Sequence, residues 1–295
     1  MNSKSVLVTG GTGFVGSHLV RFLVEKGLDV HVLVRPNSKL SVLNETLSAC
    51  TVHVHDSSLE SMKEIFLDVM PSHVFHLASL FVAEHNDSNF RELFESNIVF
   101  SSYLAEAMLV SNTRYLINTG TSWQHYHNEE YNPVNLYAAT KKAFHDILRY
   151  YVEAHDIKVV TLALFDTYGP NDPRQKLFSL LREVSLSRGV LDMSPGDQLI
   201  DMVYIDDVVS AFYSAYKNIS EQAGGHYYYG VSSSNPVTLK SLVAIFEQVI
   251  GNEININWGK RKYRAREVMT PWDAFQTLPG WKPRVSIEEG IRRSL

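Results

Sequence analysis

Residues 5–16 constrain the fold more than any other part of the chain. They read Ser-Val-Leu-Val-Thr-Gly-Gly-Thr-Gly-Phe-Val-Gly, an apolar, β-branched run that ends in a glycine-rich turn. A helical pattern with Leu19, Phe22 and Leu23 on one face follows at once. Strand, tight turn and helix in this order predict the first βα unit of a parallel sheet.

The glycine spacing in this turn predicts a dinucleotide site. Gly10 permits the tight turn, Gly13 lets the backbone approach a pyrophosphate, and Gly16 lets the helix pack closely on the strand. The helix then directs its positively polarised N-terminus at a phosphate pair. We expect the residues of this turn to contact the cofactor, namely Gly10, Thr12, Gly13, Phe14, Val15 and Gly16.

Length and composition allow a full α/β core. The chain has 295 residues, 45% of them hydrophobic, which is enough for a large core and a smaller lobe. A net charge of -5 without a basic block argues against nucleic acid as the main partner. Cys50 is the single cysteine, so no disulfide framework exists. No apolar run reaches membrane-spanning length and no signal peptide precedes the first strand, so we expect a cytoplasmic protein without a membrane partner.

The end of the second predicted strand bears on the form of the cofactor. Residues 30–34 form this strand, and Arg35 follows it with Ser38 and Lys39 close by. An acidic residue here binds the ribose 2′-hydroxyl of NAD, whereas an arginine accommodates the 2′-phosphate of NADP. The sequence therefore favours NADP (NADPH). An ordinary basic turn that accepts either cofactor is the alternative.

The spacing of Gly10, Gly13 and Gly16 resembles the short-chain dehydrogenase/reductase superfamily, in its extended branch of nucleotide-sugar epimerases, dehydratases and reductases. The segment Phe-Asp-Thr-Tyr-Gly-Pro at residues 165–170 and the segment Pro-Gly-Trp-Lys-Pro at residues 279–283 are similar to the same branch. The resemblance implies an α/β fold, a Rossmann-type doubly wound parallel sheet with a smaller interleaved C-terminal substrate lobe. It assigns residues 1–166 to a dinucleotide-binding domain, to which the chain returns over residues 202–230. Residues 167–201 and 231–295 are assigned to the substrate lobe. We also expect a homodimer.

The resemblance places further residues against the cofactor. Residues 51–55 are a predicted third strand, and an acidic residue after it stands near the adenine ring in the family. The fourth strand ends in a sequence similar to the family's His-Leu-Ala-Ala, and a predicted helix over residues 90–110 carries a matching asparagine. These positions are Asp56, Ser57, Leu77, Ala78, Ser79 and Asn97. His76 is interpreted as a packed strand histidine.

A tyrosine and a lysine four residues apart are the predicted catalytic pair. Tyr137 and Lys141 lie on one face of a predicted helix, so both can point at the same nicotinamide ribose. A free tyrosine has a pKa of roughly 10, and an adjacent ammonium and a nicotinamide cation favour its phenolate. A hydroxyl at the end of the fifth strand, residues 115–119, is expected to hold the reacting oxygen. In the family it stands four residues before a tyrosine, which selects Ser122, with Thr121 as the alternative.

Substrate-binding residues are expected around and after the sixth strand, Lys158–Leu164. Asp166 replaces the family's asparagine that contacts the phosphates of the sugar nucleotide, and Ile200 stands where an arginine is frequent. We expect other residues to contact the substrate instead, with surface charge on a small lobe as the alternative. These are Trp123, Asp166, Arg174, Lys176 and Arg264. The histidines and glutamates of residues 125–130 are interpreted as a polar loop, so no metal is expected.

The residues after Ser122 separate the reactions of this family. A 4,6-dehydratase carries Asp-Glu there as an acid–base pair, whereas this chain has Trp123 and Gln124. Epimerase/reductases of the GDP-fucose synthase kind use a cysteine and a histidine as extra acid and base, but Cys50 is far in topology from the site. This leaves 4-ketoreduction or 4-epimerisation. Residues 135–141 and 165–174 are similar to the CDP-3,6-dideoxyhexose synthases, which implies NADPH-dependent reduction of a CDP-4-keto-3,6-dideoxyhexose at C4 for O-antigen sugar. A UDP-sugar 4-epimerase with bound NAD and a non-catalytic NADP-binding sensor are the alternatives.

Overall fold

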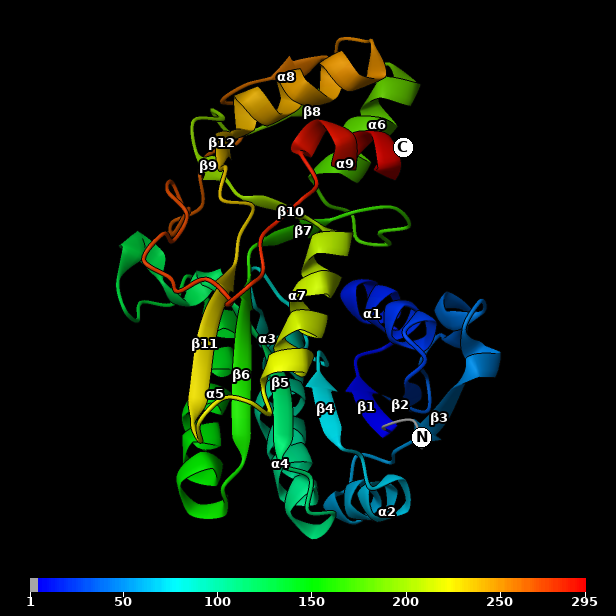
Figure 1. Ribbon diagram of the computed structural model, residues 1–295. Coiled ribbons are helices and arrows are strands. Elements are labelled where there is room, and N and C mark those ends of the chain that lie inside the picture. Colours follow the sequence, from blue (N-terminus) through cyan, green and yellow to red (C-terminus); the bar gives the residue numbers. More distant parts are fainter. Residues whose placement is uncertain (1–4) are drawn as a thin grey trace.

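A parallel sheet lies at the centre of the computed structural model, which describes residues 5–295 (Figure 1). Within these residues seven strands form the sheet in the order β11-β6-β5-β4-β1-β2-β3, and every neighbouring pair is parallel. The strands are β1 (Ser5–Thr9), β2 (Asp29–Val34), β3 (Cys50–Val54), β4 (His73–His76), β5 (Tyr115–Thr121), β6 (Lys158–Leu164) and β11 (His226–Val231). The order reverses between β1 and β4, which confirms the predicted Rossmann-type doubly wound fold.

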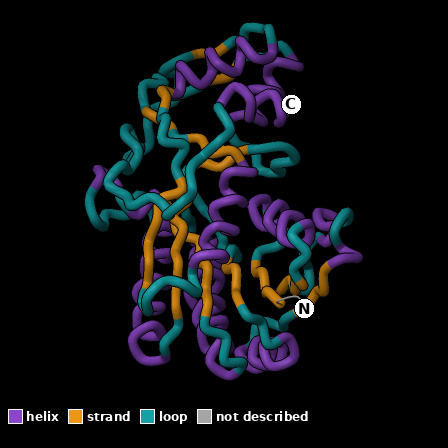
Figure 2. Tube along the Cα trace, in the orientation of Figure 1, coloured by secondary structure: helices purple, strands orange, loops and turns teal. Residues whose placement is uncertain are grey.

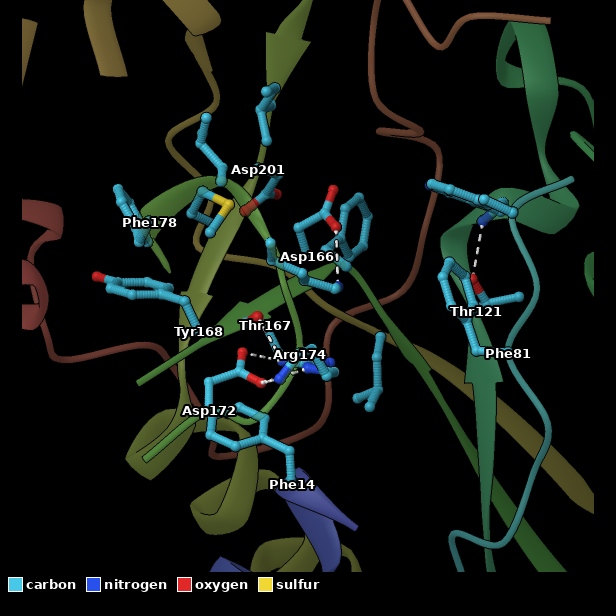
Figure 3. A pocket seen from close by; sticks show the side chains of 18 of the residues that line it. Phe14, Phe81, Thr121, Asp166, Thr167, Tyr168, Asp172, Arg174, Phe178 and Asp201 are labelled. Carbon is cyan, nitrogen blue, oxygen red and sulfur yellow. Dashed lines mark hydrogen bonds and ion pairs between the residues drawn. The ribbon is translucent and has the colours of Figure 1, made fainter. Parts of the chain in front are cut away.

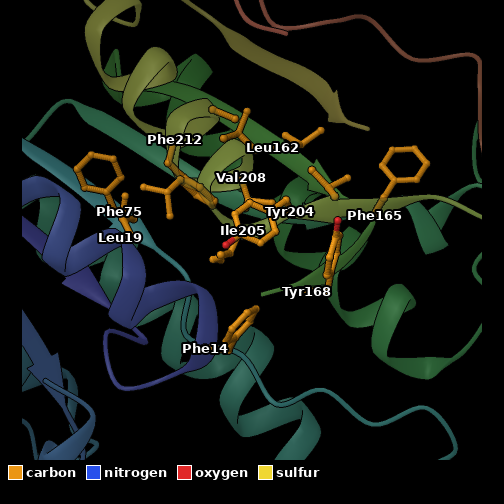
Figure 4. Close-up of a cluster of buried hydrophobic side chains, with 14 of the residues drawn as sticks. Phe14, Leu19, Phe75, Leu162, Phe165, Tyr168, Tyr204, Ile205, Val208 and Phe212 are labelled. Carbon is orange, nitrogen blue, oxygen red and sulfur yellow. The ribbon is translucent and has the colours of Figure 1, made fainter. Parts of the chain in front are cut away.

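Helices cover both faces of this sheet. α1 (Phe14–Glu25) and α7 (Ile205–Asn218) pack together on one face, and α2 (Leu59–Val69), α4 (Phe100–Val110) and α5 (Leu136–His155) cover the other. Alternate residues of β1 serve the two faces. Val6 and Val8 join the core under α1 and α7, part of which Figure 4 shows, and Leu7 joins the core under the opposite helices. A strand buried on both faces needs a continuous apolar run, as the sequence of β1 has.

The helical segment between β4 and β5 contains an irregular turn. Residues 90–110 were expected to form one helix, but α3 (Asp87–Phe94) passes into a π-helical turn over Glu95–Val99 before α4 begins. Such a turn inserts one residue into a helix and is frequent at functional sites. Asn97 lies in this turn and is 1% exposed. The turn therefore directs the Asn97 side chain inward, toward the loop after β4.

The C-terminal part of the chain forms smaller layers above the sheet edge (Figure 1). Its helices are α6 (Leu177–Ser187), α8 (Leu239–Ile250) and α9 (Ile287–Ser294), close to the predicted helices over residues 177–188, 238–250 and 287–294. Its strands pair as β7 (Asp166–Tyr168) with β10 (Met202–Tyr204), β9 (Leu199–Ile200) with β12 (Val237–Thr238), and β8 (Leu191–Asp192) with β13 (Ile256–Asn257). The sequence predicted a strand only at residues 255–258, where β13 lies. Residues 258–286 are mostly loop (Figure 2).

Short 3₁₀ turns connect several of these elements. They lie at Leu40–Leu43, Leu47–Ala49, Ser122–Gln124 and Tyr126–Asn128. The last two come after β5 and lead the chain from the end of this strand toward the C-terminal part. Among residues 5–295 every helix is too short or too polar to cross a lipid bilayer.

Candidate active site

A cavity of about 1130 Å³ lies between the carboxyl edge of the sheet and the C-terminal part of the chain. Its walls come from the glycine turn, from the ends of β4, β5 and β6, from α5 and α6, and from residues 264–272. Figure 3 shows part of it, with Phe14 on one side and Phe81 and Thr121 on another. Ligands of doubly wound sheets bind at this edge, where the strand order reverses.

The glycine turn has the close backbone packing that a pyrophosphate site requires. Gly10 has a φ of 70°, and a Cβ on it would lie 2.6 Å from the backbone nitrogen of Ala78. A Cβ on Gly16 would lie 2.0 Å from the Gly10 carbonyl oxygen, so α1 packs against the turn only with glycine there. α1 has no side-chain cap at Gly13, and residues 13–16 line the cavity. The uncapped N–H groups of the first turn are therefore available to an anion, and the turn fits a dinucleotide.

A buried hydrogen-bond chain holds the end of β4 against the turn. The Thr9 hydroxyl accepts a hydrogen bond from the Ala78 backbone at 3.1 Å and lies 2.8 Å from Nδ1 of His76. Nε2 of His76 lies 2.9 Å from the Ser101 hydroxyl. His76 is fully buried, and burial holds its pKa well below the usual value. It is a packed, neutral strand histidine, as predicted, and of the expected cofactor residues after it Leu77 and Ser79 line the cavity.

The residues expected at the adenosine end of a cofactor lie along the same sheet edge, outside this cavity. Arg35 follows β2 and is exposed, and its turn is closed by reciprocal 3.0 Å hydrogen bonds with Ser38. Asp56 follows β3, where its carboxylate accepts a hydrogen bond from the Ser58 backbone at 2.8 Å. Contact of Thr12, Arg35, Ser38, Asp56, Ser57 and Ala78 with a cofactor remains a prediction.

Asn97 has its side-chain amide engaged within the protein. Its Nδ2 donates to the Leu80 carbonyl and to the Thr140 hydroxyl, each at 3.0 Å, and its Oδ1 accepts from the Leu80 backbone at 2.8 Å. Asn97 thus ties the loop after β4 to α5. Direct contact of Asn97 with a cofactor remains a prediction.

The first turns of α5 carry both Tyr137 and Lys141, but only Tyr137 is among the residues that line the cavity. The Asn135 side chain caps this helix by accepting a hydrogen bond from the Ala138 backbone at 2.9 Å. Tyr137 is 9% exposed and lines the cavity. Lys141 is 3% exposed, and among residues 5–295 its ammonium has no hydrogen bond or ion pair. A buried ammonium without a partner fits the ribose hydroxyls of a bound dinucleotide.

Burial dominates the electrostatics of this pair. It lowers the pKa of Lys141 from 10.5 to about 8. Burial also raises the pKa of Tyr137, and a hydrogen bond with Ser79 opposes this shift only in part. The sequence suggested that the ammonium would favour the phenolate, but in the free protein desolvation sets the direction of the Tyr137 pKa shift. Tyr137 is therefore protonated at neutral pH and can act as a proton donor.

The two candidate hydroxyls after β5 differ in their hydrogen bonding. The Thr121 hydroxyl accepts a hydrogen bond from the Trp123 backbone at 3.2 Å and caps the 3₁₀ turn, as Figure 3 shows. Ser122 lines the same cavity, and within residues 5–295 its hydroxyl has no hydrogen-bond partner. Ser122 therefore keeps its whole hydroxyl for a ligand, whereas Thr121 has one acceptor site engaged in the turn and only its O–H proton left to donate.

The expected substrate residues line the cavity, and two of them, Arg174 and Lys176, are paired with acidic side chains. Arg174 donates from Nε and Nη2 to Asp172, each at 2.7 Å, and its guanidinium lies 4.4 Å from the Phe14 ring centre (Figure 3). Lys176 forms an ion pair with Asp166 at 3.6 Å. Arg264 and Trp123 also line the cavity. The structure thus gathers all five expected substrate residues around one cavity.

Several cavity residues escaped the sequence reasoning. They are Phe81, His125, Tyr126, Val134, Phe178 and Trp272. Tyr228, on β11, donates a hydrogen bond to Gln124 and lies 3.3 Å from Nε2 of His125. The His125 ring stacks on Trp272 with ring centres 3.8 Å apart. Asn135, which caps α5, also escaped, although an asparagine before an amphipathic run is a typical helix cap. Within the described residues no three His, Cys, Asp or Glu side chains are arranged to hold a metal.

Comparisons with known proteins agree with this architecture. A CDP-abequose synthase from Salmonella muenchen is 27% identical over 296 residues, covering 99% of this chain and 97% of that protein. A UDP-glucuronate 4-epimerase from Thermodesulfobacterium geofontis is 24% identical over 316 residues, covering 98% of this chain and 94% of that protein. The solved structure of a UDP-N-acetylglucosamine 4-epimerase from Methanobrevibacter ruminantium is 23% identical and matches with a TM-score of 0.87, covering 100% of this chain and 97% of that one.

The family is shown by the extent of the match to its sequence model. The model of the NAD dependent epimerase/dehydratase family matches residues 6–230, from the first strand of the sheet to its last. This span includes the glycine turn, the Ser122 turn and the Tyr137–Lys141 pair. The chain therefore belongs to the NAD dependent epimerase/dehydratase family.

Proposed function

We propose that the protein is an NADPH-dependent nucleotide-sugar 4-ketoreductase that reduces a CDP-4-keto-3,6-dideoxyhexose, or a related nucleotide-linked 4-keto-6-deoxy sugar. The main support is one cavity lined by the glycine turn, by Ser122 with its available hydroxyl and by a protonated Tyr137, with the buried Lys141 one helical turn further along α5. Similarity to CDP-abequose synthases supports the sugar class. We place this reaction in the synthesis of O-antigen sugars in the cytoplasm. We also propose that the enzyme is a homodimer.

The proposed mechanism assigns one task to each residue. When bound, NADPH supplies a hydride to the C4 carbonyl carbon. Ser122 donates a hydrogen bond to the carbonyl oxygen, and Tyr137 passes its proton to that oxygen as negative charge develops there. Lys141 binds the ribose and stabilises the phenolate that remains on Tyr137 until water returns the proton. The carbonyl gains one hydride and one proton and becomes a hydroxyl.

The position of Gln124 supports reduction without dehydration. Gln124 is 1% exposed, hydrogen-bonds to Tyr228 and is not among the residues that line the cavity. Trp123 does line the cavity, but an indole carries no proton that it can exchange at neutral pH. No acid–base pair therefore follows Ser122 to remove water across two sugar carbons.

The cofactor preference gives a direct test of Arg35. We expect Arg35→Ala to weaken NADPH binding by about 2 kcal/mol, roughly 30-fold, because a charged hydrogen bond to the 2′-phosphate is lost. NADH has no 2′-phosphate, so its affinity is expected to change little. Titrating both nucleotides by fluorescence measures the two effects. Equal losses for both would show that Arg35 is only a surface residue.

The reaction direction is tested by stoichiometry. With a CDP-4-keto-3,6-dideoxyhexose we expect one NADPH consumed for each 4-hydroxy product, followed by absorbance and mass spectrometry. With an unmodified nucleotide hexose we expect no loss of water. Similarity to 4-epimerases makes epimerisation the second candidate. A 4-epimer formed without net cofactor consumption would establish that candidate instead.

A further inference from the structure

Phe81 is a large apolar side chain that remains half exposed inside the active-site cavity. It is 48% exposed and lines the cavity, where Figure 3 shows it near Thr121. Its ring meets the Tyr137 ring edge-on with centres 5.0 Å apart, and the Trp123 ring with centres 5.6 Å apart. Phe81 thus borders the space beside the proposed proton donor.

The backbone on both sides of Phe81 is held in place. Leu80 exchanges hydrogen bonds with the Asn97 side chain at 2.8 Å and 3.0 Å. The carbonyls of Val82 and Ala83 accept from Nδ2 of Asn135 at 3.2 Å and 3.0 Å. Because Asn135 also caps α5, the position of Phe81 is coupled to that of Tyr137 on the same helix. The backbone at Phe81 is therefore held in position in the free protein.

The side chains around Phe81 on this side of the cavity are apolar, and the indole N–H of Trp123 is the one hydrogen-bond donor that they carry. Ala83 and Val134 line the cavity together with Phe81 and Trp123, and we call these four residues the apolar wall. The backbone nitrogen of Trp123 is engaged by Thr121, and the carbonyl of Trp123 accepts from Val134 at 2.8 Å. The Lys176 ammonium lies 5.7 Å from the Phe81 ring centre and is paired with Asp166.

We propose that the apolar wall, chiefly Phe81, selects hexoses without a hydroxyl on C3, the ring carbon next to the reacting carbonyl. The inference rests on the proposed function, which places C4 at Tyr137. A hydroxyl on C3 is attached directly to the ring, so contact with the apolar wall removes the water molecules that solvate it. A hydroxyl on C6 is attached outside the ring and can rotate away from the wall. A buried hydroxyl without a partner weakens binding by roughly 5- to 150-fold.

Two product sugars that differ only at C3 test this proposal. CDP-3,6-dideoxyglucose and CDP-6-deoxyglucose are titrated calorimetrically into the protein with NADP present. We expect the wild type to bind the dideoxy sugar roughly 5- to 150-fold more tightly. Phe81→Gln, which offers hydrogen-bonding groups at similar length, is expected to reduce this ratio at least about fivefold. Phe81→Leu, which keeps the wall apolar, is expected to retain it.

Phe90 provides the matched control. It is also 48% exposed, but it lies on α3 and is not among the residues that line the cavity, so Phe90→Gln should keep the wild-type ratio. Equal wild-type affinities, an unchanged ratio in Phe81→Gln, or binding of neither sugar would overturn the proposal. Turnover of the corresponding 4-keto sugars is measured in parallel. A preserved affinity ratio without any ketoreduction would refute the proposed function and leave the wall's selectivity standing.

Discussion

Replacing Tyr137 by phenylalanine is expected to lower kcat by roughly 100- to 10,000-fold, the usual contribution of a general acid. In the proposed mechanism the phenol hydroxyl is the proton source, and its raised pKa keeps it protonated at neutral pH. The ring itself remains, so its edge-on contact with Phe81 at 5.0 Å is preserved. NADPH affinity is therefore expected to stay within about twofold of the wild type, since the lost group acts on the sugar oxygen.

Tyr151→Phe is the control for this experiment. Tyr151 lies on the same helix, is 6% exposed and donates a hydrogen bond to Glu106 at 2.7 Å, outside the cavity. It tests whether loss of any buried phenol on α5 slows the enzyme. Steady-state rates and cofactor titrations are compared for both variants. If Tyr137→Phe kept most of its rate, the proton would have to come from another group.

Replacing Lys141 by methionine is expected to stabilise the free protein while it removes activity. The pKa of Lys141 is lowered from 10.5 to about 8 by burial. The folded state thus binds fewer protons than the unfolded state between these values, and stability rises with pH across that window. Below pH 8 the full penalty is present, up to about 3 kcal/mol. Methionine fills similar space without charge, so the gain is expected at pH 7 and shrinks toward pH 10.

Urea unfolding at pH 7 and pH 9.5 measures this gain, with Lys142→Met as the control. Lys142 is the next residue but pairs with Asp146 near the surface, so its replacement is expected to change the unfolding free energy by less than about 1 kcal/mol. Lys141→Met is also expected to bind NADPH roughly 10- to 150-fold more weakly, since a charged hydrogen bond to the ribose is lost. A destabilised Lys141→Met protein at pH 7 would contradict the view of Lys141 as a buried, unpaired charge.

Local patterns predicted most of the sheet and its helices. The central parallel strands are buried on both faces, so their apolar runs are visible in the sequence, as in Val6, Leu7 and Val8. The glycine turn was readable because Gly10 and Gly16 have contacts that no other residue tolerates. The π-helical turn at Asn97 was not predicted, because its hydrogen bonds reach Leu80 and Thr140, which are distant in sequence.

The spacing of Tyr137 and Lys141 by itself determined that two functional groups share one helix face, since helical geometry acts within a few residues. Only the tertiary structure decided their charge states, because desolvation depends on every element packed around α5. The same holds for Ser122 and Thr121, which differ in whether the Trp123 backbone engages the hydroxyl. It also holds for Phe81, whose place beside Tyr137 depends on side chains from the π-helical turn and from the cap of α5. Contacts between segments so far apart leave no periodic mark in a sequence.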